Sequence, residues 1–404
     1  MYLTHLSLTN FRSFSRLDMD IPRQILLLVG ANAQGKTSLL EAIYYLAAFT
    51  SFHAQNDRQL VNFIAGREEL AVGRLIAQYQ RGTTQHKMEI RLIQEQNGQG
   101  GTRLKKEIIL DGVNRKIHEA LGHFNAVIFL PQMTRILEGS PEERRRYLNL
   151  MICQAKPVYT RALSEYHQVL VQRNALLKTL MERKGDASQL DYWDDLLAQK
   201  GAVIIEQRIS AIREIEKLAA VIHSRLTNSQ EILRLVYDPS LDPLAKNDNQ
   251  MVLPLQVSTE RGHLTYEEIK QAFMQKMQQS RSEEIMRGLT LRGPHRDDIH
   301  FLANGIDLEH YGSRGQIRTT LLALKMAEVA WLKEKTGHSP VLLLDEILAE
   351  LDLQRRADLL EVLDGVEQAL LTTTDLHLFS ETFVSAQTVW KVNEGRVELE
   401  NYSA

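Results

Sequence analysis

The chain has 404 residues and a formal net charge of −3, with 44% hydrophobic and 25% charged residues. This composition is ordinary for a globular protein and leaves room for two or three domains. Because acidic and basic residues almost balance, a global positive field is excluded, and any nucleic-acid binding must use a local basic surface.

The chain shows no sign of export or membrane insertion. Its N-terminus lacks a basic segment followed by an apolar stretch, so we expect no secretory signal. The most apolar run, residues 25–30, is too short to span a bilayer. The single cysteine, Cys153, excludes an internal disulfide and is expected to be a small buried hydrophobe. We therefore expect a cytoplasmic protein that does not bind membranes.

The first piece, residues 1–139, is predicted to be rich in β-strands. Apolar residues alternate with polar ones within 6–21 and at 86–93, which is typical of strands with one buried face. The glycine-rich segment 97–101 predicts a loop, and an Asp-Gly pair within 109–117 predicts a tight hairpin. We expect this piece to be the N-terminal part of an α/β domain.

GANAQGKT (30–37) lies between a continuous apolar run, 25–29, and a segment with helical spacing, 38–49. It matches the phosphate-loop pattern G-x-x-x-x-G-K-[ST] in the strand–loop–helix context that the pattern requires. In such loops the lysine, here Lys36, reaches the β- and γ-phosphates, and the hydroxyl of Thr37 binds Mg²⁺. A glycine-rich turn that happens to contain a lysine is the alternative. The residues expected to bind ATP here are Gly30, Asn32, Gly35, Lys36, Thr37 and Ser38.

The second piece, residues 140–288, is predicted to be a helical lobe. Ser140 and Glu143 form a capping-box signal at the start of its first helix. Residues 237–258, which contain Pro, Asp and Asn, are predicted to be irregular, and 266–288 is predicted to be a further helix.

Two helical stripes lie between these segments. After Pro157, apolar residues recur at spacings of three and four, interrupted by Arg173, and the pattern resumes after the polar break 183–189. Two such stripes joined by a polar turn predict an antiparallel helical hairpin. With about 20–30 residues in each helix, the hairpin would be an arm of roughly 30–45 Å. Packing of the stripes onto other helices of a compact lobe is an equally open alternative.

The third piece, residues 289–404, returns to α/β character and is predicted to complete the first domain. Its central signal is VLLLDE (341–346), an apolar strand that ends in two carboxylates. Such a strand places Asp345 beside Mg²⁺ and directs Glu346 towards the γ-phosphate, where it can activate a water molecule.

The phosphate loop and VLLLDE lie near opposite ends of the chain, with the helical piece between them. A helix at 353–364, a strand at 369–373 and a hairpin-like segment at 386–399 are predicted to follow. A long insertion between these two motifs is typical of ABC-type ATPases with inserted arms. We therefore predict an α/β ABC-type P-loop ATPase head built from both chain ends, with an inserted α-helical lobe or short arm.

Three short segments resemble further motifs of ABC-type ATPases. SRGQ (313–316) resembles the signature motif, and it belongs to a polar, glycine-rich stretch that we expect to be a loop before a helical run at 323–332. LAELD (348–352) resembles the D-loop, and TTTD (372–375) lies where the switch loop is expected.

Longer segments resemble one family, the RecF DNA replication and repair proteins of bacteria. They occur in the family's order over nearly the whole chain: NFRSF (10–14), the phosphate loop with LLEAIYYLAAFTSF after it, GSPEERRRYL (139–148), GPHRDDI (293–299), YGSRGQIRTTLLALKMAE and LLLDEILAELD. GPHRDD and the residues around the phosphate loop are much more specific than the bare loop pattern.

This resemblance implies roles for individual residues. Lys36, Asp345 and Glu346 would be catalytic, Thr37 and Asp345 would bind Mg²⁺, and Glu346 would be the general base. Ser313 and Gly315 would contact the γ-phosphate held by the other subunit of a dimer, and Asp352 would lie at the dimer interface.

Two further residues have an open alternative. Arg12, in NFRSF, resembles an arginine that reaches the phosphate side of the nucleotide, but it could be a surface charge at a strand end. Gln132 would suit the glutamine that touches Mg²⁺ in other ABC-type ATPases, although it could be a polar loop residue. The family commonly has Pro-Glu-Asp where this chain has Pro131-Gln132-Met133.

Other positions depart from the family's pattern. His53 and Asn56 stand where basic residues are usual, and both changes remove permanent positive charge. They put in doubt an arginine acting on the partner's site, or a DNA contact, at that place. Thr374 occupies the position at which many ABC-type ATPases have a histidine.

Candidate DNA contacts are few. Five arginines lie at the entry to and the exit from the helical lobe: Arg144, Arg145, Arg146, Arg292 and Arg296. Arginine contacts to phosphates would dominate affinity and make it sensitive to salt. The alternative is that the triplet Arg144–Arg146 pairs with the neighbouring Glu142 and Glu143 or with Asp297 and Asp298.

The resemblance implies a DNA-repair ATPase. An ATP-dependent homodimer would close on double-stranded DNA near single-strand gaps, weak DNA-stimulated hydrolysis would release it, and RecO and RecR would be its partners in recombinase loading. A transporter ATPase subunit and an SMC-type chromosome-organising protein are alternatives. The helical insertion is too long for the first and too short for the second. A binding module without ATPase activity is disfavoured because Glu346 is present.

Overall fold

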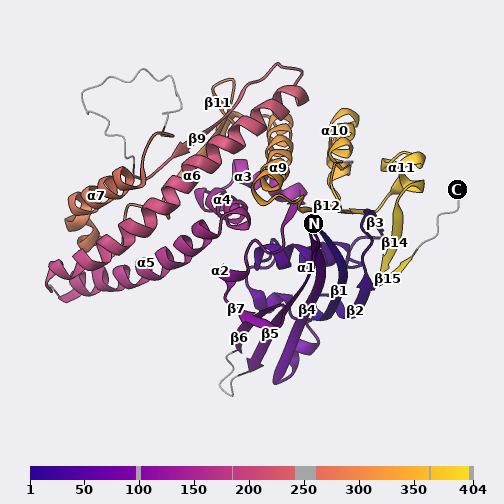
Figure 1. Ribbon diagram of the computed structural model, residues 1–404, viewed down its shortest axis with the longest axis horizontal. Helices are drawn as coiled ribbons and strands as arrows, with labels where there is room; N and C mark the ends of the chain where they lie inside the picture. The colour runs from indigo at the N-terminus through magenta and orange to yellow at the C-terminus, as the bar shows by residue number, and fades with distance from the viewer. Residues whose placement is uncertain (97–101, 184, 242–260, 364, 400–404) are drawn as a thin grey trace. The chain divides into compact units, whose positions relative to one another are not determined.

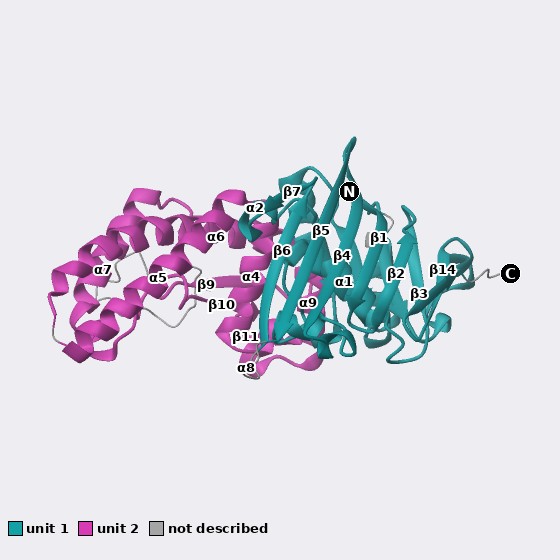
Figure 2. Cartoon of the chain, turned by 90° about the horizontal axis from the view of Figure 1, so that it is seen from below, with its two compact units in different colours: residues 1–133, 328–404 teal, residues 134–327 magenta. Residues whose placement is uncertain are grey.

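The structure is a computed structural model that describes residues 1–96, 102–183, 185–241, 261–363 and 365–399 (Figure 1). The predicted loop at 97–101 and most of the predicted irregular stretch at 237–258 lie outside these residues. Contacts divide the chain into two compact units (Figure 2). The first unit combines residues 1–133 with 328–404, and the second comprises 134–327, which contains the predicted helical lobe.

A mainly parallel sheet forms the centre of the first unit, in the order β15-β14-β3-β13-β12-β8. Its strands are β3 (Ile25–Val29), β8 (Ala126–Phe129), β12 (Val341–Asp345), β13 (Ala369–Thr373), β14 (Thr388–Asn393) and β15 (Arg396–Leu399), of which only β15 is antiparallel to its neighbour. β3 lies between two strands from the C-terminal piece, which confirms that this sheet is built from both chain ends. Continuous apolar runs are expected of such buried parallel strands, and helix α1 (Lys36–Ala48) packs against β8, β12 and β13.

The second sheet of this unit is antiparallel, in the order β2-β1-β4-β5-β6-β7. Its strands are β1 (Tyr2–Phe11), β2 (Phe14–Asp20), β4 (Leu70–Arg81), β5 (Thr84–Gln96), β6 (Thr102–Leu110) and β7 (Val113–Arg115). The predicted Asp-Gly hairpin joins β6 to β7. Asp111 and Gly112 both have positive φ, 50° and 81°, as the two central residues of a tight hairpin turn require.

Short elements complete the first unit. They are the 3₁₀ turns η1 (Asp57–Leu60), η2 (Ala65–Arg67), η3 (Pro131–Thr134), η5 (Ile347–Glu350) and η6 (Leu376–Leu378), and the helices α2 (Ile117–Ala120), α10 (Leu353–Leu363) and α11 (Glu381–Ser385). The predicted C-terminal helix, strand and hairpin are thus confirmed as α10, β13 and β14–β15.

The second unit contains the predicted helical hairpin. Its helices are α3 (Arg135–Glu138), α4 (Pro141–Ala155), α5 (Pro157–Arg183), α6 (Leu190–Leu226), α7 (Tyr266–Arg287), α8 (Leu308–Tyr311) and the start of α9 (Arg314–Thr336), with the turn η4 (Ala187–Gln189) between α5 and α6. α5 and α6 pack side by side, and α7 packs against both (Figure 1). The two helices form the predicted antiparallel hairpin, but they do not stand alone, because α7 packs against both. The structure therefore shows the packed alternative.

A small antiparallel sheet completes this unit, with the order β11-β10-β9. It consists of β9 (Leu233–Asp238), β10 (Asp298–Ala303) and β11 (Ile306–Asp307). Tyr237 and Asp238 were predicted to be irregular but belong to β9. β9 pairs with β10, which follows it by some sixty residues. A strand whose partner lies so far away in the chain cannot be predicted from local sequence patterns. None of the described helices is long and apolar enough to cross a membrane.

Arg173, which interrupts the apolar stripe of α5, is fully buried. Its guanidinium group donates hydrogen bonds of 2.7 Å to Asp194 on α6 and 2.7 Å to Glu284 on α7, and one of 2.8 Å to the hydroxyl of Thr290. Both carboxylates are also fully buried. The interruption is therefore an ion network that ties three helices together.

GPHRDDI, the family-specific segment, forms a second buried network. Asp297 accepts hydrogen bonds of 2.9 Å from both Arg208 and the backbone N–H of Ser240, and one from the Tyr237 hydroxyl. His295 accepts from the hydroxyl of Tyr166 at Nδ1, 2.7 Å, and Nε2 lies 3.2 Å from the carbonyl oxygen of Thr290. These contacts suit a neutral imidazole. The segment is thus a structural element of the helical unit.

Burial also sets the titration of Cys153 and His295. Cys153 is 5% exposed, as predicted for a small buried hydrophobe, and burial raises the pKa of its thiol to about 11. Burial lowers the pKa of His295 to about 4. Both groups are therefore neutral at pH 7.

The Arg173 network predicts a large loss of stability. Arg173→Met should lower the free energy of unfolding of the helical unit by about 3–5 kcal/mol, because it removes the cation paired with the buried Glu284 and leaves Asp194 with Arg281 as its remaining partner. Urea titration followed by circular dichroism measures this loss. Arg287→Met is the matched control, because the pair of Arg287 with Glu283 is exposed and should contribute less than about 1 kcal/mol. Equal losses in the two variants would contradict a structural role for the buried network.

His295 predicts that stability falls with acidification. Its folded-state pKa of about 4 lies below the unfolded value of about 6.5, so the unfolded chain binds the extra proton between these pH values. The free energy of unfolding should therefore decrease as pH falls from 6.5 to 4, by roughly 3 kcal/mol in all. His295→Gln should flatten this dependence, whereas the exposed His53→Gln should leave it unchanged. Urea titrations at pH 7 and pH 5 measure the change in the free energy of unfolding between the two pH values. The same change in His295→Gln as in the parent would show that His295 is not its cause.

Candidate nucleotide-binding site

The phosphate loop connects β3 to α1, as predicted. Gly35 has a φ of 112°, a conformation that favours glycine, and immediately precedes the first helical residue, Lys36. At Gly30 a Cβ atom would lie only 2.3 Å from the carbonyl oxygen of Val392. Glycine is therefore required at both ends of the loop by backbone geometry and by the close approach of β14.

The turn between β14 and β15 holds the loop from outside. The side-chain carbonyl of Gln34 accepts a 2.7 Å hydrogen bond from the N–H of Glu394, and its backbone carbonyl accepts one of 3.1 Å from Gly395. The hairpin at the C-terminal end of the chain thus fixes the loop near the N-terminal end. A preorganised loop of backbone amides is the arrangement that binds phosphate at a helix N-terminus.

Lys36 is 4% exposed, yet it carries a charge. Its Nζ donates to the carbonyl oxygens of Gly30, at 2.6 Å, and Ala31, at 3.0 Å. Nζ also lies 3.1 Å from a carboxylate oxygen of Glu346. These oxygens compensate a buried ammonium group that would otherwise be costly, and they hold it at the base of the loop.

Thr37 and Asp345 meet beside this ammonium group. The Thr37 hydroxyl oxygen lies 2.9 and 3.0 Å from the two carboxylate oxygens of Asp345, which is buried. A hydroxyl and a carboxylate are hard oxygen donors of the kind that Mg²⁺ takes from proteins at phosphate sites. The donor set of this pair therefore fits the predicted metal.

Thr372, on the neighbouring strand β13, joins the two acidic residues. Its hydroxyl donates a 2.7 Å hydrogen bond to Asp345 and accepts one of 3.0 Å from the backbone N–H of Glu346. Glu346 has a φ of 51°, so the chain turns sharply after β12. The sequence reasoning assigned this threonine to the switch loop and missed its contact with Asp345. Residues at the ends of adjacent parallel strands lie side by side, so the two predicted strands that end near Asp345 and Thr372 were the signal for this contact.

Arg12 makes a buried contact within this unit. Its Nε and Nη2 donate hydrogen bonds of 2.7 and 2.8 Å to the two carboxylate oxygens of Glu41, and Nη1 donates to the carbonyl oxygen of Gln59. Glu41, on α1, is 1% exposed and also accepts from the hydroxyl of Ser51. Arg12 is therefore not an isolated surface charge. Sequence reasoning missed Glu41 because it lies on a helix face that reads as apolar.

The remaining predicted residues of the first unit are more exposed. Gln132 lies in the 3₁₀ turn just after β8, and Asn32 is exposed on the phosphate loop. Asp352 accepts a 2.9 Å hydrogen bond from the backbone N–H of Arg355, which lowers the pKa of its carboxyl group, and it also pairs with the guanidinium group of Arg355. The departures His53, Asn56 and Thr374 are also exposed, and Ser38 is half-buried.

SRGQ lies in the second unit, where it begins helix α9. The N–H of Ser313 donates to Oε1 of Gln316, 2.9 Å, and the N–H of Gln316 donates to the Ser313 hydroxyl, 3.2 Å. This reciprocal capping box starts the helix at Arg314. The prediction of a loop through residue 316 was therefore wrong, because a serine with a glutamine three residues later outweighs the glycine between them.

The arginine cluster divides into buried and exposed members. Arg144 is 2% exposed and uses its guanidinium group on Asp298, at 2.7 and 2.8 Å, on the carbonyl of Gly139 and on Glu309. The hydrogen bonds that Arg144 donates to Asp298 raise the pKa of its guanidinium group. Arg144 is therefore a structural residue. Its pair with Asp298 matches the alternative stated for the triplet and corrects its prediction as a DNA contact. Arg145 is partly buried and donates to the carbonyl of Asp297.

The other three predicted DNA contacts, Arg146, Arg292 and Arg296, have exposed side chains.

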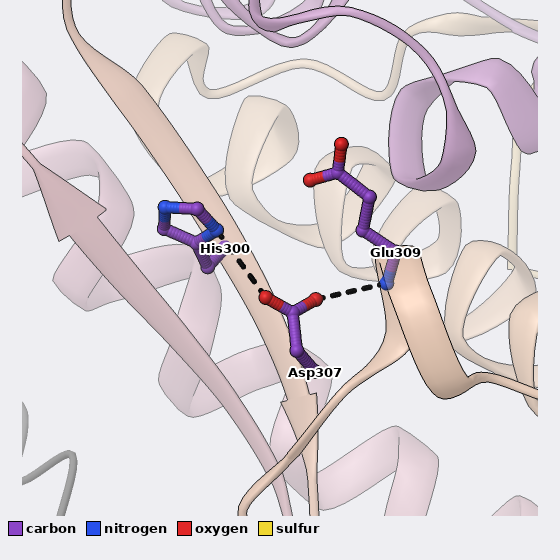
Figure 3. Close-up of side chains that lie close together, drawn as sticks. All are labelled: His300, Asp307 and Glu309. Atoms are coloured by element: carbon purple, nitrogen blue, oxygen red, sulfur yellow. Dashed lines mark hydrogen bonds and ion pairs between the residues drawn. The ribbon is translucent and has the colours of Figure 1, made fainter. Parts of the chain in front are cut away.

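His300, Asp307 and Glu309, also in the second unit, bring together residue types that ligate metals (Figure 3). Asp307 accepts from the backbone N–H of Glu309, 2.9 Å, and lies 3.5 Å from His300. Glu309 pairs with Arg144. Because an arginine already supplies the positive charge, we interpret this cluster as structural.

Comparisons with known proteins agree with this architecture. Residues 2–397 match the family model described as the RecF/RecN/SMC N terminal domain. DNA replication and repair protein RecF of Chloroflexus aurantiacus is 37% identical over 98% of this chain and 99% of its own length, and that of Lacticaseibacillus casei has the same identity and coverage. The chain belongs to the RecF family.

Solved structures extend the RecF match to the fold. The structure of the recombination mediator protein RecF with ATP has a TM-score of 0.83 and 30% identity and covers 99% of both chains. The RecF complex named RecF-ATPrS has a TM-score of 0.82 and 29% identity over 99% of this chain. The predicted ABC-type head with an inserted helical region is therefore confirmed as the fold.

Proposed function

We propose that the protein is an ATP-hydrolysing, DNA-binding member of the RecF family that acts in recombinational repair. The observation that carries this proposal is the convergence of Lys36, Thr37, Asp345 and Glu346 at one end of the parallel sheet. These residues come from two motifs at opposite ends of the chain. The relatives are named as DNA replication and repair proteins, and one is named with ATP.

The residues would divide the chemistry among them. Lys36 would bind the β- and γ-phosphates, and Glu346 would orient and deprotonate the attacking water. Thr37 and Asp345, and Gln132 at the end of β8, would hold Mg²⁺, which when bound neutralises charge on the phosphates. Because Lys36 now pairs with Glu346 at 3.1 Å, phosphate binding would draw the ammonium group away and free the carboxylate.

The start of α9 at SRGQ (313–316), here called the signature turn, would complete the ATP site of a second copy of the chain. Gly315 has open space where a Cβ would stand, since the nearest atom, Oγ of Ser313, is 3.9 Å away. No contact within the described part of the chain therefore requires glycine at this position. Close approach of a phosphate from a partner subunit supplies a reason. Asp352, exposed on the first unit, would face the same interface.

Duplex DNA near single-strand gaps is the proposed nucleic-acid ligand. Arg146, Arg292 and Arg296 are exposed and could neutralise phosphates, with a strong dependence on salt. ATP would favour the dimer that retains DNA, and slow DNA-stimulated hydrolysis would release it. RecO and RecR are the proposed protein partners in recombinase loading, because the similar solved proteins are described in the RecFOR pathway.

Glu346→Gln should separate binding from hydrolysis. The variant should lose hydrolysis by roughly 100-fold or more, since the general base is removed, while its ATP-bound dimer accumulates and retains short duplex DNA. Gel filtration with and without ATP, followed by DNA titration at low salt, measures this. Ser313→Arg is the contrasting variant, because it should bind ATP as a monomer but neither dimerise nor hydrolyse. A Glu346→Gln protein that stays monomeric with ATP and never retains DNA would end the clamp proposal.

The hydrogen bond from Thr372 to Asp345 predicts that loss of this hydroxyl weakens the binding of Mg²⁺ with ATP. Thr372→Val should weaken that affinity about 10-fold or more, because Asp345 loses the hydroxyl that orients it. Thr372→Ser keeps the hydroxyl and should bind nearly as well as the parent. Titration with a fluorescent ATP analogue at several Mg²⁺ concentrations measures the effect. A serine variant as weak as the valine variant would point to packing as the cause.

A further inference from the structure

The signature turn contacts the chain segment that follows α6 through one carboxylate, that of Glu231. Nε2 of Gln316 donates a 2.8 Å hydrogen bond to Oε1 of Glu231, while Oε1 of the same glutamine accepts from the N–H of Ser313. Both ends of the Gln316 amide are thereby used. Glu231 lies in the connection between α6 and β9, outside every motif that the sequence suggested.

Glu231 has a further polar neighbour besides Gln316. Its side chain is 19% exposed, and Oε2 lies 3.5 Å from Nε2 of His223, a fully buried residue in the last turn of α6. The N–H of the next residue, Ile232, donates a 2.9 Å hydrogen bond to the side-chain carbonyl oxygen of Asn304, and its carbonyl oxygen accepts one of 3.0 Å from the N–H of Asn304. The backbone next to Glu231 is therefore anchored to the end of β10.

Two successive turns of α9 meet the last turn of α6 and the connection that follows it. Thr320 follows Gln316 by one helical turn, and its hydroxyl lies 3.2 Å from Nε2 of His223. Gln316 and Thr320 thus face the same side of α9, as residues four apart on a helix do. His223 and Glu231 are the groups that they meet.

The chemistry of the two side chains explains what Glu231 does. A carboxylate only accepts hydrogen bonds, so it must face the NH₂ group of the Gln316 amide. The amide carbonyl is then directed at the N–H of Ser313, as the capping box requires. Without Glu231, no acceptor holds the NH₂ group of the Gln316 amide in this orientation. The amide can then turn so that its NH₂ group faces the N–H of Ser313, from which an NH₂ group cannot accept a hydrogen bond.

We propose that Glu231 is a positioning residue for the signature turn and acts through Gln316 on Ser313. It would touch no nucleotide, yet hydrolysis across the dimer would depend on it. This inference rests on the proposed function, in which Ser313 and Gly315 face the ATP of the partner subunit. It adds a residue from the helical lobe to the catalytic requirements of the dimer.

The first test compares three variants. Glu231→Ala should lower the rate of hydrolysis at saturating ATP about 10-fold, the effect expected when a supporting contact is lost, with monomer ATP affinity and the thermal midpoint unchanged. Glu231→Gln should restore most of the rate, because its side-chain carbonyl can still accept from Gln316. Glu216→Ala removes a nearby carboxylate of α6 that pairs with Arg234 and should have no effect. Parental activity in Glu231→Ala would overturn the inference.

The second test mixes two impaired proteins. Lys36→Ala lacks a working phosphate loop but keeps its signature turn, whereas Glu231→Ala has the opposite defect. A mixed dimer contains one composite site with both parts intact, so mixing should raise hydrolysis above that of either variant alone. A residue needed only for its own chain's fold or phosphate loop would give no such recovery, and that outcome would overturn the inference.

The same mixture separates this inference from the proposed function. Ser313→Arg replaces Glu231→Ala in a parallel experiment with Lys36→Ala. Recovery with Ser313→Arg but not with Glu231→Ala would refute the role of Glu231 and leave the composite site standing. Failure of both mixtures would refute the composite site itself, and with it the basis of the inference.

Discussion

The contact between Thr37 and Asp345 is the interaction on which the rest of the site depends. It joins residues 308 positions apart, at 2.9 and 3.0 Å, and exists only because β3 and β12 flank β13 in one parallel sheet. Every other contact of the site follows from that arrangement. Lys36 precedes Thr37, Glu346 follows Asp345, and Thr372 on β13 bridges the two acids.

The Lys36–Glu346 pair adds a chemical constraint. A buried ammonium group needs compensation, and in this structure the group expected to serve as base supplies part of it at 3.1 Å. The same carboxylate cannot neutralise the lysine and activate water at full strength. ATP phosphates would compete for the lysine, so that the binding of ATP would also release the proposed base. This coupling would keep the base restrained until the nucleotide arrives.

The sequence predicted the parts of the structure that are encoded locally. β3, β12 and β13 are apolar runs, the capping signal at Ser140 starts α4, and the phosphate loop has its strand and helix. It failed where the partner lies far away in the chain. Arg173 looked like an interruption although two distant helices complete its network, and Thr372, Glu41 and Glu231 acquire their contacts only through the fold. For Arg144 the sequence left a pair with Asp298 open beside a DNA contact, and the structure contains that pair.

GPHRDDI shows what a specific motif does and does not establish. It helped to identify the family, yet Asp297 and His295 contact Arg208, Tyr237 and Tyr166 within the helical unit. The contacts that place the signature turn come instead from Glu231, which no motif includes. A buried charge network constrains many side chains at once, so it leaves a recognisable segment. A single carboxylate that orients one amide constrains only its partner. The residues that position a reactive group can therefore be less visible in a sequence than those that hold the surrounding fold.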